Sequence, residues 1–357
     1  MSPETMSAPE VVPTHSDNLE SKVLPRPLGL KAGDRVVVRS ADEILRTLDA
    51  RGMLENLPFM PEMLEFCGKP FRVLNRVVQS TIDGAFLRDH SESWVRQFRN
   101  NDVVTLDSVR CGGEKHDGCQ RACAIFWKEA WLQRFEDHLC EAATSAPAKP
   151  LPNGLVSLLK TKTESEKYFC QSSEFLNATL HLSGLQRIKK CFSAIAARNI
   201  SGWGMLKRLA IWMWWKMHRK FIGEHVRGSL DKTPTQVLGL QPGDLVEIKS
   251  IPEIVASLNR TGHNRGLHFS ADQRPFCGRR YRVRNRVDNF IAEGTGEMKH
   301  FRNTVMLQDV HCDSACFAFG GCYRTDLLYW REIWLKRVDQ PQVAAAPCPV
   351  PNTVSAE

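Results

Sequence analysis

The residues with the richest chemistry in this chain are its cysteines, of which twelve occur among 357 residues. Eight of them form two sets of four: Cys67, Cys111, Cys119 and Cys123 in the first half, and Cys277, Cys312, Cys316 and Cys322 in the second. His116 lies inside the first set, in a stretch that also contains three glycines. Four thiolate or imidazole groups are what a structural zinc ion binds, in a tetrahedral arrangement.

The spacing of these residues predicts zinc sites. Cys119 and Cys123 are close enough in a loop to bind one ion, and so are Cys312 and Cys316. Cys111 with either His116 or Cys67 would complete the first site. Cys322 and Cys277 would complete the second. We therefore expect Zn²⁺ with the following ligands: Cys67, Cys111, His116, Cys119, Cys123, Cys277, Cys312, Cys316 and Cys322. There are three alternatives: buried thiols that pack as small hydrophobic residues, disulfides, and a less favoured iron–sulfur cluster.

A second interpretation starts from His116 and Asp117, because a histidine beside a cysteine can activate it as a nucleophile. The second half has no histidine in register, since Phe319 lies near that place. The chain also lacks a phosphate-binding loop, a dinucleotide fingerprint, a catalytic-triad motif and the HExxH motif. We therefore predict a non-enzymatic binding or scaffold module. The alternative is a thiol-dependent enzyme centred on the residues Cys111, His116, Cys119 and Cys123.

The two cysteine sets belong to a repeated unit. Leu28-Gly29-Leu30 with Gly33-Asp34 returns as Leu238-Gly239-Leu240 with Gly243-Asp244, and Phe66-Cys67-Gly68 returns as Phe276-Cys277-Gly278, both 210 residues later. The offset becomes 201 at Cys111 and Cys312, and 203 at Trp127-Lys128-Glu129 and Trp330-Arg331-Glu332. With these shifts Cys119 corresponds to Cys322, and Cys123 to Asp326. Three blocks in the same order indicate a duplicated domain.

The elements of each unit follow from local patterns. The turn at Gly33-Asp34 precedes an alternating strand at 35–39, and the same pattern recurs at 245–249. Ser40 with Glu43, and Ser250 with Glu253, are spaced as capping boxes that begin short helices. Further strands are expected at 71–78, 103–106 and 304–307. Each unit closes on an aromatic segment, 126–132 or 329–335.

These short strands predict an α+β protein: two homologous small β-barrels, SH3-like or similar, joined by a helical segment. The predicted organisation is a disordered tail at 1–27, a first unit at 28–137, a linker and basic helical segment at 138–237, a second unit at 238–339 and a disordered tail at 340–357. A small antiparallel sandwich fits the pattern nearly as well.

The closing segments carry a shared Trp-x-Glu-x-Trp pattern. Trp127 and Trp131, like Trp330 and Trp334, are four residues apart, and we expect them to pack in the core. A platform for stacking a base or a sugar is the alternative. The glutamates between them are flanked by Lys128 and Arg331, and we expect exposed ion pairs there.

Between the units, residues 205–221 combine tryptophans with lysines and arginines, after a helical pattern at 173–180. Gly202 and Gly204 are expected to divide the basic stretch into two helices. Three uses are open: a clamp that buries its tryptophans between the units, which we favour; a helix on an anionic membrane surface; or, less favoured, a nucleic-acid contact. The apolar run at 209–215 is too short to span a bilayer, which needs about 20 residues.

Composition adds little about function. The net charge of +8 is compatible with anionic partners. The first 27 residues lack the apolar core of a signal peptide, so a cytoplasmic location with reduced thiols is expected, with membrane association at most peripheral.

Taken whole, the chain resembles a family of bacterial hypothetical proteins with a duplicated cysteine- and tryptophan-containing unit. The resemblance covers nearly all of residues 28–339. It rests on the segments 57–63, Phe66-Cys67-Gly68, the Cys111-His116-Cys119-Cys123 cluster with 126–132, Tyr168-Phe169-Cys170-Gln171, and 329–335. It implies the duplicated architecture and a context of polysaccharide or secondary-metabolite gene clusters. It supplies no activity and no partner.

Overall fold

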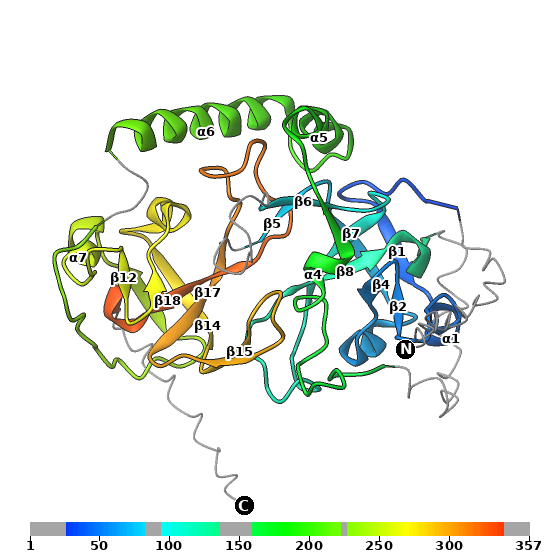
Figure 1. The fold of residues 1–357 in the computed structure, drawn as a ribbon, viewed down its shortest axis with the longest axis horizontal. Helices are drawn as coiled ribbons and strands as arrows, with labels where there is room; N and C mark the ends of the chain where they lie inside the picture. The colour runs from blue at the N-terminus through cyan, green and yellow to red at the C-terminus, as the bar shows by residue number, and fades with distance from the viewer. Residues whose placement is uncertain (1–25, 83–93, 136–158, 223–226, 339–357) are drawn as a thin grey trace, which may run out of the picture.

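The computed structural model describes residues 26–82, 94–135, 159–222 and 227–338 (Figure 1). The tails predicted at 1–27 and 340–357 fall outside these ranges, except for residues 26 and 27. The linker expected around 145–152 is also outside the described residues. The described chain forms two antiparallel five-stranded sheets, with two longer helices along one side of the molecule.

The two sheets have the same strand order. The first runs β8-β7-β4-β1-β9 and the second β18-β17-β14-β11-β19. The first sheet consists of β1 (Arg35–Val38), β4 (Pro70–Arg76), β7 (Val103–Arg110), β8 (Ala124–Lys128) and β9 (Leu132–Arg134). The second consists of β11 (Leu245–Ile248), β14 (Arg280–Arg286), β17 (Thr304–His311), β18 (Leu327–Arg331) and β19 (Leu335–Arg337).

The strand register also agrees between the sheets. Val36 lies opposite Phe71 and Arg134, and its counterpart Val246 lies opposite Tyr281 and Arg337. These partners are offset by the same 210 and 203 residues as the sequence blocks. The chain therefore contains two similar β domains, as its repeated blocks predict.

The short elements recur as well. The first unit contains α1 (Ala41–Leu45), β2 (Met53–Leu54), β3 (Leu57–Pro58), η1 (Pro61–Phe66) and η3 (Glu129–Trp131), where η denotes a 3-10 helix. The second contains α7 (Ile251–Val255), β12 (His263–Asn264), β13 (Leu267–His268), η5 (Ala271–Phe276) and η6 (Glu332–Trp334). The predicted capping boxes at Ser40 and Ser250 are confirmed, because each glutamate side chain accepts from the backbone N–H of its serine.

The units differ after β4 and β14. In the first, β5 (Ser80–Thr81), β6 (Val95–Phe98) and β10 (Thr179–His181) form a three-stranded sheet. In the second, β15 (Asn289–Ile291) and β16 (Met298–His300) form a two-stranded hairpin. Because β10 comes from the segment between the units, that segment is part of the first unit's structure and not only a connection.

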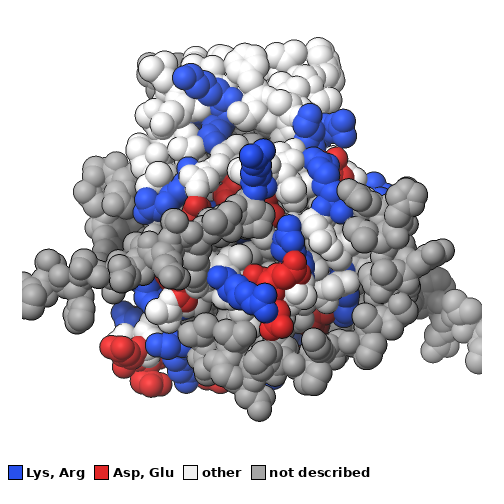
Figure 2. Space-filling view, turned by 90° about the vertical axis from the view of Figure 1, so that its right-hand side faces the viewer, with Lys and Arg blue, Asp and Glu red and all other residues white. Residues whose placement is uncertain are grey.

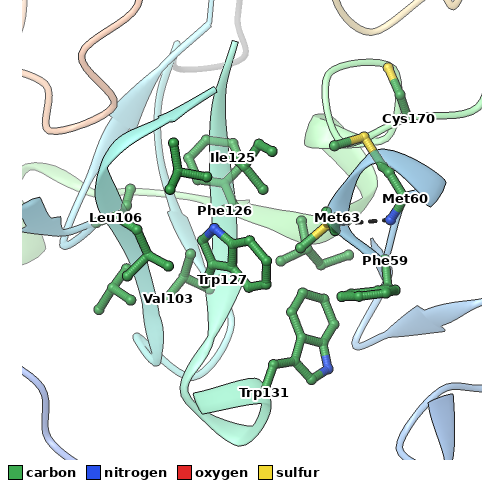
Figure 3. Packing of buried hydrophobic residues seen from close by; sticks show 14 of the residues in the cluster. Phe59, Met60, Met63, Val103, Leu106, Ile125, Phe126, Trp127, Trp131 and Cys170 are labelled. Atoms are coloured by element: carbon green, nitrogen blue, oxygen red, sulfur yellow. Dashed lines mark hydrogen bonds between the residues drawn. The ribbon is translucent and has the colours of Figure 1, made fainter. Parts of the chain in front are cut away.

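The tryptophan pairs lie in the cores, as expected. Trp127 and Trp131 are fully buried, and Phe59 packs edge-on against both, beneath Met60 and Met63 (Figure 3). Trp131 also donates its indole N–H to the Thr47 hydroxyl at 3.1 Å. In the second unit Trp334 donates to Ser257 in the same way, at 3.2 Å. Full burial leaves these rings no surface for stacking a ligand.

The segment between the units contains α4 (Phe175–Ala178), α5 (Gly184–Ala196) and α6 (Gly202–Ile222). The helix expected at 173–180 is shorter, because β10 begins at Thr179. The expected division into two helices is confirmed, but the break lies at 197–201, and Gly202 begins α6. None of the described helices is long and apolar enough to cross a membrane.

Candidate functional site between the two units

In each unit the glutamate between the two tryptophans is buried, contrary to the sequence expectation of exposed ion pairs. Glu129 is 1% exposed and accepts from the backbone N–H groups of Gly29 at 3.0 Å and Leu30 at 2.7 Å. Its ion-pair partner is Arg76 of β4 at 2.6 Å, whereas Lys128 pairs with Glu55 and Asp102. These contacts fasten the segment before β1 to the 3-10 helix before β9.

Glu332 has the corresponding role in the second unit. It is fully buried and forms an ion pair with Arg286 at 3.0 Å. It also accepts from the backbone N–H groups of three consecutive residues, Leu238, Gly239 and Leu240. Both glutamates are therefore structural, and they explain why the units share the Leu-Gly-Leu block.

Cys67 and Cys277 occupy matching places at the ends of η1 and η5. Each thiol donates a long hydrogen bond of 3.8 Å to a carbonyl four residues earlier, that of Met63 or Gln273. Burial raises the pKa of each thiol to about 11. Each cysteine thus behaves as a protonated packing residue.

The other cysteines lie in two loops that dock reciprocally. We call residues 111–123 the first cysteine loop and residues 312–326 the second. Gln120 of the first loop donates its backbone N–H to the carbonyl of Asn289 in the second unit, at 2.8 Å. Tyr323 of the second loop donates to the carbonyl of Gln79 in the first unit, at 3.3 Å. These four residues correspond pairwise in the repeat, so the exchange is nearly two-fold symmetric.

The cysteines of the loops take part in this exchange. The backbone N–H of Ile291 points at the Cys119 sulfur, 3.4 Å away. The corresponding Cys322 lies 3.7 Å from the Ser80 hydroxyl. Small, weakly polar thiols suit such a contact, because they fill space beside backbone groups without a charge. Docking of the two units thus accounts for both cysteines.

A buried ion network lies beside these contacts. Arg121 and Arg324 occupy equivalent positions, and Glu293 forms an ion pair with both of them. Asp326 lies 3.0 Å from Arg324 and 3.8 Å from Arg121. Glu293 and Arg324 are each 2% exposed. Arg121 is the one member of this network from the first unit, so its charge is paired with these carboxylates only while the two units remain docked.

His116 is held by groups other than cysteines. Its Nδ1 lies 2.6 Å from the Glu62 carboxylate, and its Nε2 lies 3.0 Å from the Phe169 carbonyl. Burial lowers the pKa of His116, but the hydrogen bond and the charge of Glu62 outweigh it, so the pKa is raised. Both ring nitrogens face acceptors, and a ring that donates from both is an imidazolium. His116 therefore has no nitrogen free for a metal or for a proton taken from a thiol.

In the second unit, Asp272 corresponds to Glu62, but a thiol replaces the histidine. Cys312 donates to the Asp272 carboxylate at 3.0 Å and lies 3.1 Å from the Ser314 hydroxyl. Burial raises the pKa of Asp272 to about 6, although the thiol hydrogen bond opposes the rise. Cys316 packs against Trp215 of α6 and Ala271. Cys316 is therefore part of the contact between α6 and the second unit.

The residues present do not fit the expected zinc ion. Four thiols, of Cys111, Cys119, Cys123 and Cys170, line a mainly apolar cavity of about 30 Å³. No three histidine, cysteine or carboxylate side chains within the described ranges are grouped so that they could hold a metal. His116 is engaged as described, and Cys67 does not line the cavity. The predicted zinc ligands thus find no support in their arrangement.

The thiols are also poorly suited to nucleophilic chemistry. Burial raises the pKa of Cys123 to about 12, and it raises those of Cys111 and Cys312 as well. An activated cysteine needs the opposite, a pKa lowered by a nearby positive charge. The ten cysteines of the described ranges are all free thiols, so the disulfide alternative is not realised among them either.

A larger cleft lies where β7 and β17 approach each other beneath α6. Its volume is about 440 Å³, within the range of small-ligand pockets, roughly 300–1,000 Å³. Its lining includes cationic side chains from both units and α6, namely those of Arg110, Arg208 and Arg284, and His311 lies beside them. Burial lowers the pKa of His311. Three carboxylates also line it, those of Asp107, Asp309 and Asp313.

Strand irregularities shape this cleft in the same way in both units. The β7–β8 ladder shifts register between Thr105 and Arg110, and the β17–β18 ladder between Met306 and His311. The bulges place Ser108 and Asp309 in the left-handed region, with φ of 60° and 58°. Bulges and left-handed residues other than glycine are frequent beside binding sites, because they redirect side chains.

Arg110 lies at the centre of the pseudo-symmetric arrangement. Its guanidinium donates to the carbonyls of Ala122 and Thr325, which are equivalent residues of the two cysteine loops. Burial lowers the pKa of Arg110, and the positive charge of Arg284 lowers it further, against the opposing effect of Asp326. Neither Arg110 nor Arg284 forms an ion pair with any residue that the structure describes.

The sequence interpretation missed the cleft and the arginines that hold the buried glutamates. Arg76 and Arg286 could have been found, since both units have the pattern Arg-Val-x-Asn-Arg at this point. The cleft left no such signal, because its lining comes from segments about 200 residues apart and its key positions differ between units. Leu74, for example, corresponds to Arg284.

No protein-family model, curated protein or solved structure matches this chain.

Proposed function

We propose that the protein is a non-enzymatic tandem binding module, whose cleft between the two units takes a small ligand with an anionic group. The observation that carries this proposal is the position of Arg110 and Arg284. Both line a cleft of about 440 Å³, and Arg284 is close enough to Arg110 for their positive charges to oppose each other. Asp326 and Asp309 act on Arg110 electrostatically, but no carboxylate within the described ranges forms an ion pair with either arginine. A phosphate or carboxylate placed between them would relieve that repulsion and could accept hydrogen bonds from both.

The remaining charges define what else the ligand should carry. Asp313 is engaged with Arg208 at 3.6 Å. Asp107 and Asp309 are exposed residues of the lining. A ligand with hydroxyl or ammonium donors beside its anionic group would satisfy these carboxylates, whereas a bare polyanion would be repelled by them. We therefore favour a compact bipolar ligand over nucleic acid for this cleft.

The two β domains act in this proposal as the rigid support of the cleft. In each, the last strand pairs with the first and follows a single 3-10 turn. This arrangement supports the SH3-like interpretation. The reciprocal docking of the cysteine loops would hold the walls of the cleft at a fixed separation, as a preformed site requires.

A thiol-dependent enzyme is the rival, and the geometry favours it less. A catalytic cysteine would need a basic histidine within hydrogen-bond reach and a lowered pKa. His116 is instead bound to Glu62 and to a carbonyl, and the thiol pKa of Cys111 is raised by burial.

The test uses the full chain and isothermal titration calorimetry with inorganic phosphate, citrate and phosphoserine as probes. We expect saturable binding of at least one probe, which weakens as salt is added. Arg284→Leu gives the second unit the residue that the first unit has at Leu74, and it should weaken binding at least fivefold. Arg279→Leu, the same change at an exposed residue that precedes β14 and does not line the cleft, should leave affinity within twofold. Failure of all three probes to bind, or unchanged affinity in Arg284→Leu, would contradict the proposal.

A further inference from the structure

Helix α6 has a second side, which faces away from the cleft. Helices α5 and α6 lie along one edge of the molecule, and α6 extends toward the second unit (Figure 1). The inner face of α6 is packed there: Trp215 is 7% exposed beside Ala271 and Cys316, and Trp212 contacts Phe319 with ring centroids 5.0 Å apart. The favoured clamp interpretation thus describes this inner face.

The outer faces of the two helices are apolar and uncovered. Of the thirteen large hydrophobic side chains that are exposed in the described part of the chain, nine belong to α5 and α6. They are Leu185, Ile188, Phe192 and Ile195 on α5, and Trp203, Leu206, Met213, Trp214 and Met217 on α6. Trp203 is 80% exposed and Phe192 70%. Scattered apolar residues are normal on a surface, but such a concentration marks an interaction site.

The spacing of these residues places them on one face of each helix. On α5 they follow each other at intervals of three and four residues, which is the period of a single helical stripe. On α6 the five residues fall within about 100° of the helix circumference at 100° per residue. The buried Met205 and Trp215 lie on the other side. Helix α6 is therefore apolar on two faces, and the described chain covers one of them.

The charge of this segment is strongly one-sided. Residues 184–222 contain nine lysines and arginines and no aspartate or glutamate. Since the whole chain has a net charge of +8, the rest of the chain has a net charge of −1. The top of Figure 2, where these helices lie, is mainly white with blue side chains. Lys189, Lys207 and Lys216 are exposed.

We propose that the outer faces of α5 and α6, which we call the α5–α6 surface, dock on a membrane containing anionic phospholipids. Exposed tryptophan, phenylalanine, leucine and methionine side chains would enter the boundary between headgroups and acyl chains. Lysines beside the stripe would reach the phosphates while their alkyl stems lie against the apolar region. The β domains would then lie on the side away from the lipid, with the cleft beneath α6.

Two other occupants fit these observations less well. A second copy would bring two surfaces of the same strong positive charge together, because a two-fold dimer contact is self-complementary. Nucleic acid would match the lysines, but it would leave Leu185, Ile188 and Leu206 without apolar partners. A lipid surface satisfies the charge and the aliphatic stripe at once.

The test is co-sedimentation of the full chain with vesicles of phosphatidylcholine alone or of phosphatidylcholine with one third phosphatidylglycerol. We expect at least tenfold stronger partitioning to the anionic vesicles, which falls as salt is raised, with a blue shift of tryptophan emission. Trp203→Ser/Trp214→Ser should reduce partitioning at least tenfold and remove most of the shift. Lys189→Glu/Lys207→Glu should reduce partitioning to a similar extent. All four side chains are exposed, so unchanged thermal unfolding is expected and should be checked.

The matched controls are Lys69→Glu/Lys232→Glu, the same charge change elsewhere on exposed residues, and Val237→Ser at an apolar residue that is 70% exposed. Both should partition within twofold of the parent protein. The proposal is overturned if the parent chain does not sediment with anionic vesicles at low salt, or if the controls lose as much as the test variants. Concentration-dependent dimerisation without lipid that Trp203→Ser/Trp214→Ser abolishes would assign the surface to a second copy instead. None of these results depends on the ligand of the cleft.

Discussion

The two units share their scaffold but differ where they could bind something. Both hold the segment before the first strand with a buried glutamate and an arginine, Glu129 with Arg76 and Glu332 with Arg286. At the cleft the correspondence ends, because Leu74 matches Arg284 and Arg110 matches His311. This buried glutamate–arginine pair is thus the same in both units, whereas the positions at the cleft differ.

The two units also differ at the buried polar pairs whose carboxylates belong to η1 and η5. In the first unit a glutamate holds a histidine, whereas in the second an aspartate holds a thiol. Both pairs fasten a cysteine loop to the element before β4 or β14. Two different chemical pairs therefore perform the same structural task in the two units.

The largest expected effect comes from removing the shared glutamates. Glu129→Ala and Glu332→Ala should each lower the free energy of unfolding by about 3 to 5 kcal/mol, because each removes the carboxylate partner of a partly buried arginine and leaves buried backbone N–H groups without an acceptor. Urea unfolding, monitored by tryptophan fluorescence, measures this loss of free energy of unfolding. Glu43→Ala, which removes an exposed capping carboxylate, serves as the control and should cost much less. If one of the two glutamates proved dispensable, the units would not share this scaffold.

A smaller effect is expected at the reciprocal interface. Gln79 donates its side-chain amide to the carbonyls of Phe319 and Gly321, and the Gln120 side chain accepts from two backbone N–H groups of the second unit, those of Asp288 and Asn289. Gln79→Ala or Gln120→Ala should each cost about 1 to 3 kcal/mol, the range for leaving buried groups unsatisfied.

The control for the interface is Gln241→Ala, an exposed change that should stay within about 0.5 kcal/mol of the parent. Because the interface is reciprocal, the two glutamine variants should destabilise the protein to a similar degree. Each variant should still unfold in one transition. Two separate transitions in either variant would indicate that the units fold independently, and that this interface contributes little to cooperativity.

Local patterns were sufficient to predict the scaffold. The capping boxes, the strands at 35–38 and 245–248, the correspondence of the units and the burial of the tryptophans all depend on residues close together in sequence or on the repeat itself. The charge of Glu129 misled the interpretation, because lysine and glutamate side by side are typical of an exposed surface. Its actual partner, Arg76, lies 53 residues away.

The contacts of the cysteines also depend on residues far away in the sequence. Their spacing within one loop predicts that they bind a common metal ion, but it does not reveal that Cys119 and Cys322 face the opposite unit, where Ile291 and Ser80 supply their contacts. The spacing of residues in the sequence limits which of them can be in contact, but the packing of the two units determines which contacts form. The cleft and the outer face of α6 could not be predicted for the same reason, since each depends on how the units pack against the helix.

The smallest effect distinguishes the two polar pairs by pH. The pKa of His116 is raised above its usual 6.5, so this group stabilises the fold fully below pH 6.5 and loses that contribution as pH rises through its folded pKa. The pKa of Glu62 is lowered, so its contribution to stability is present above pH 4.5 and lost on further acidification.

The second pair titrates in another pH range. The pKa of Asp272 is raised to about 6, so its contribution to stability is complete below pH 3.8 and is lost as the pH rises to 6. His116→Gln should therefore flatten the decline of unfolding free energy above pH 6.5, and Asp272→Asn the decline between pH 4 and 6. Each change should amount to at most about 1.4 kcal/mol per pH unit, the limit for one proton. Urea titrations at half-unit pH steps measure both slopes, with Asp231→Asn on an exposed aspartate as the control. If both variants kept the parent slope in both windows, the two pairs would not be the groups that link protons to folding.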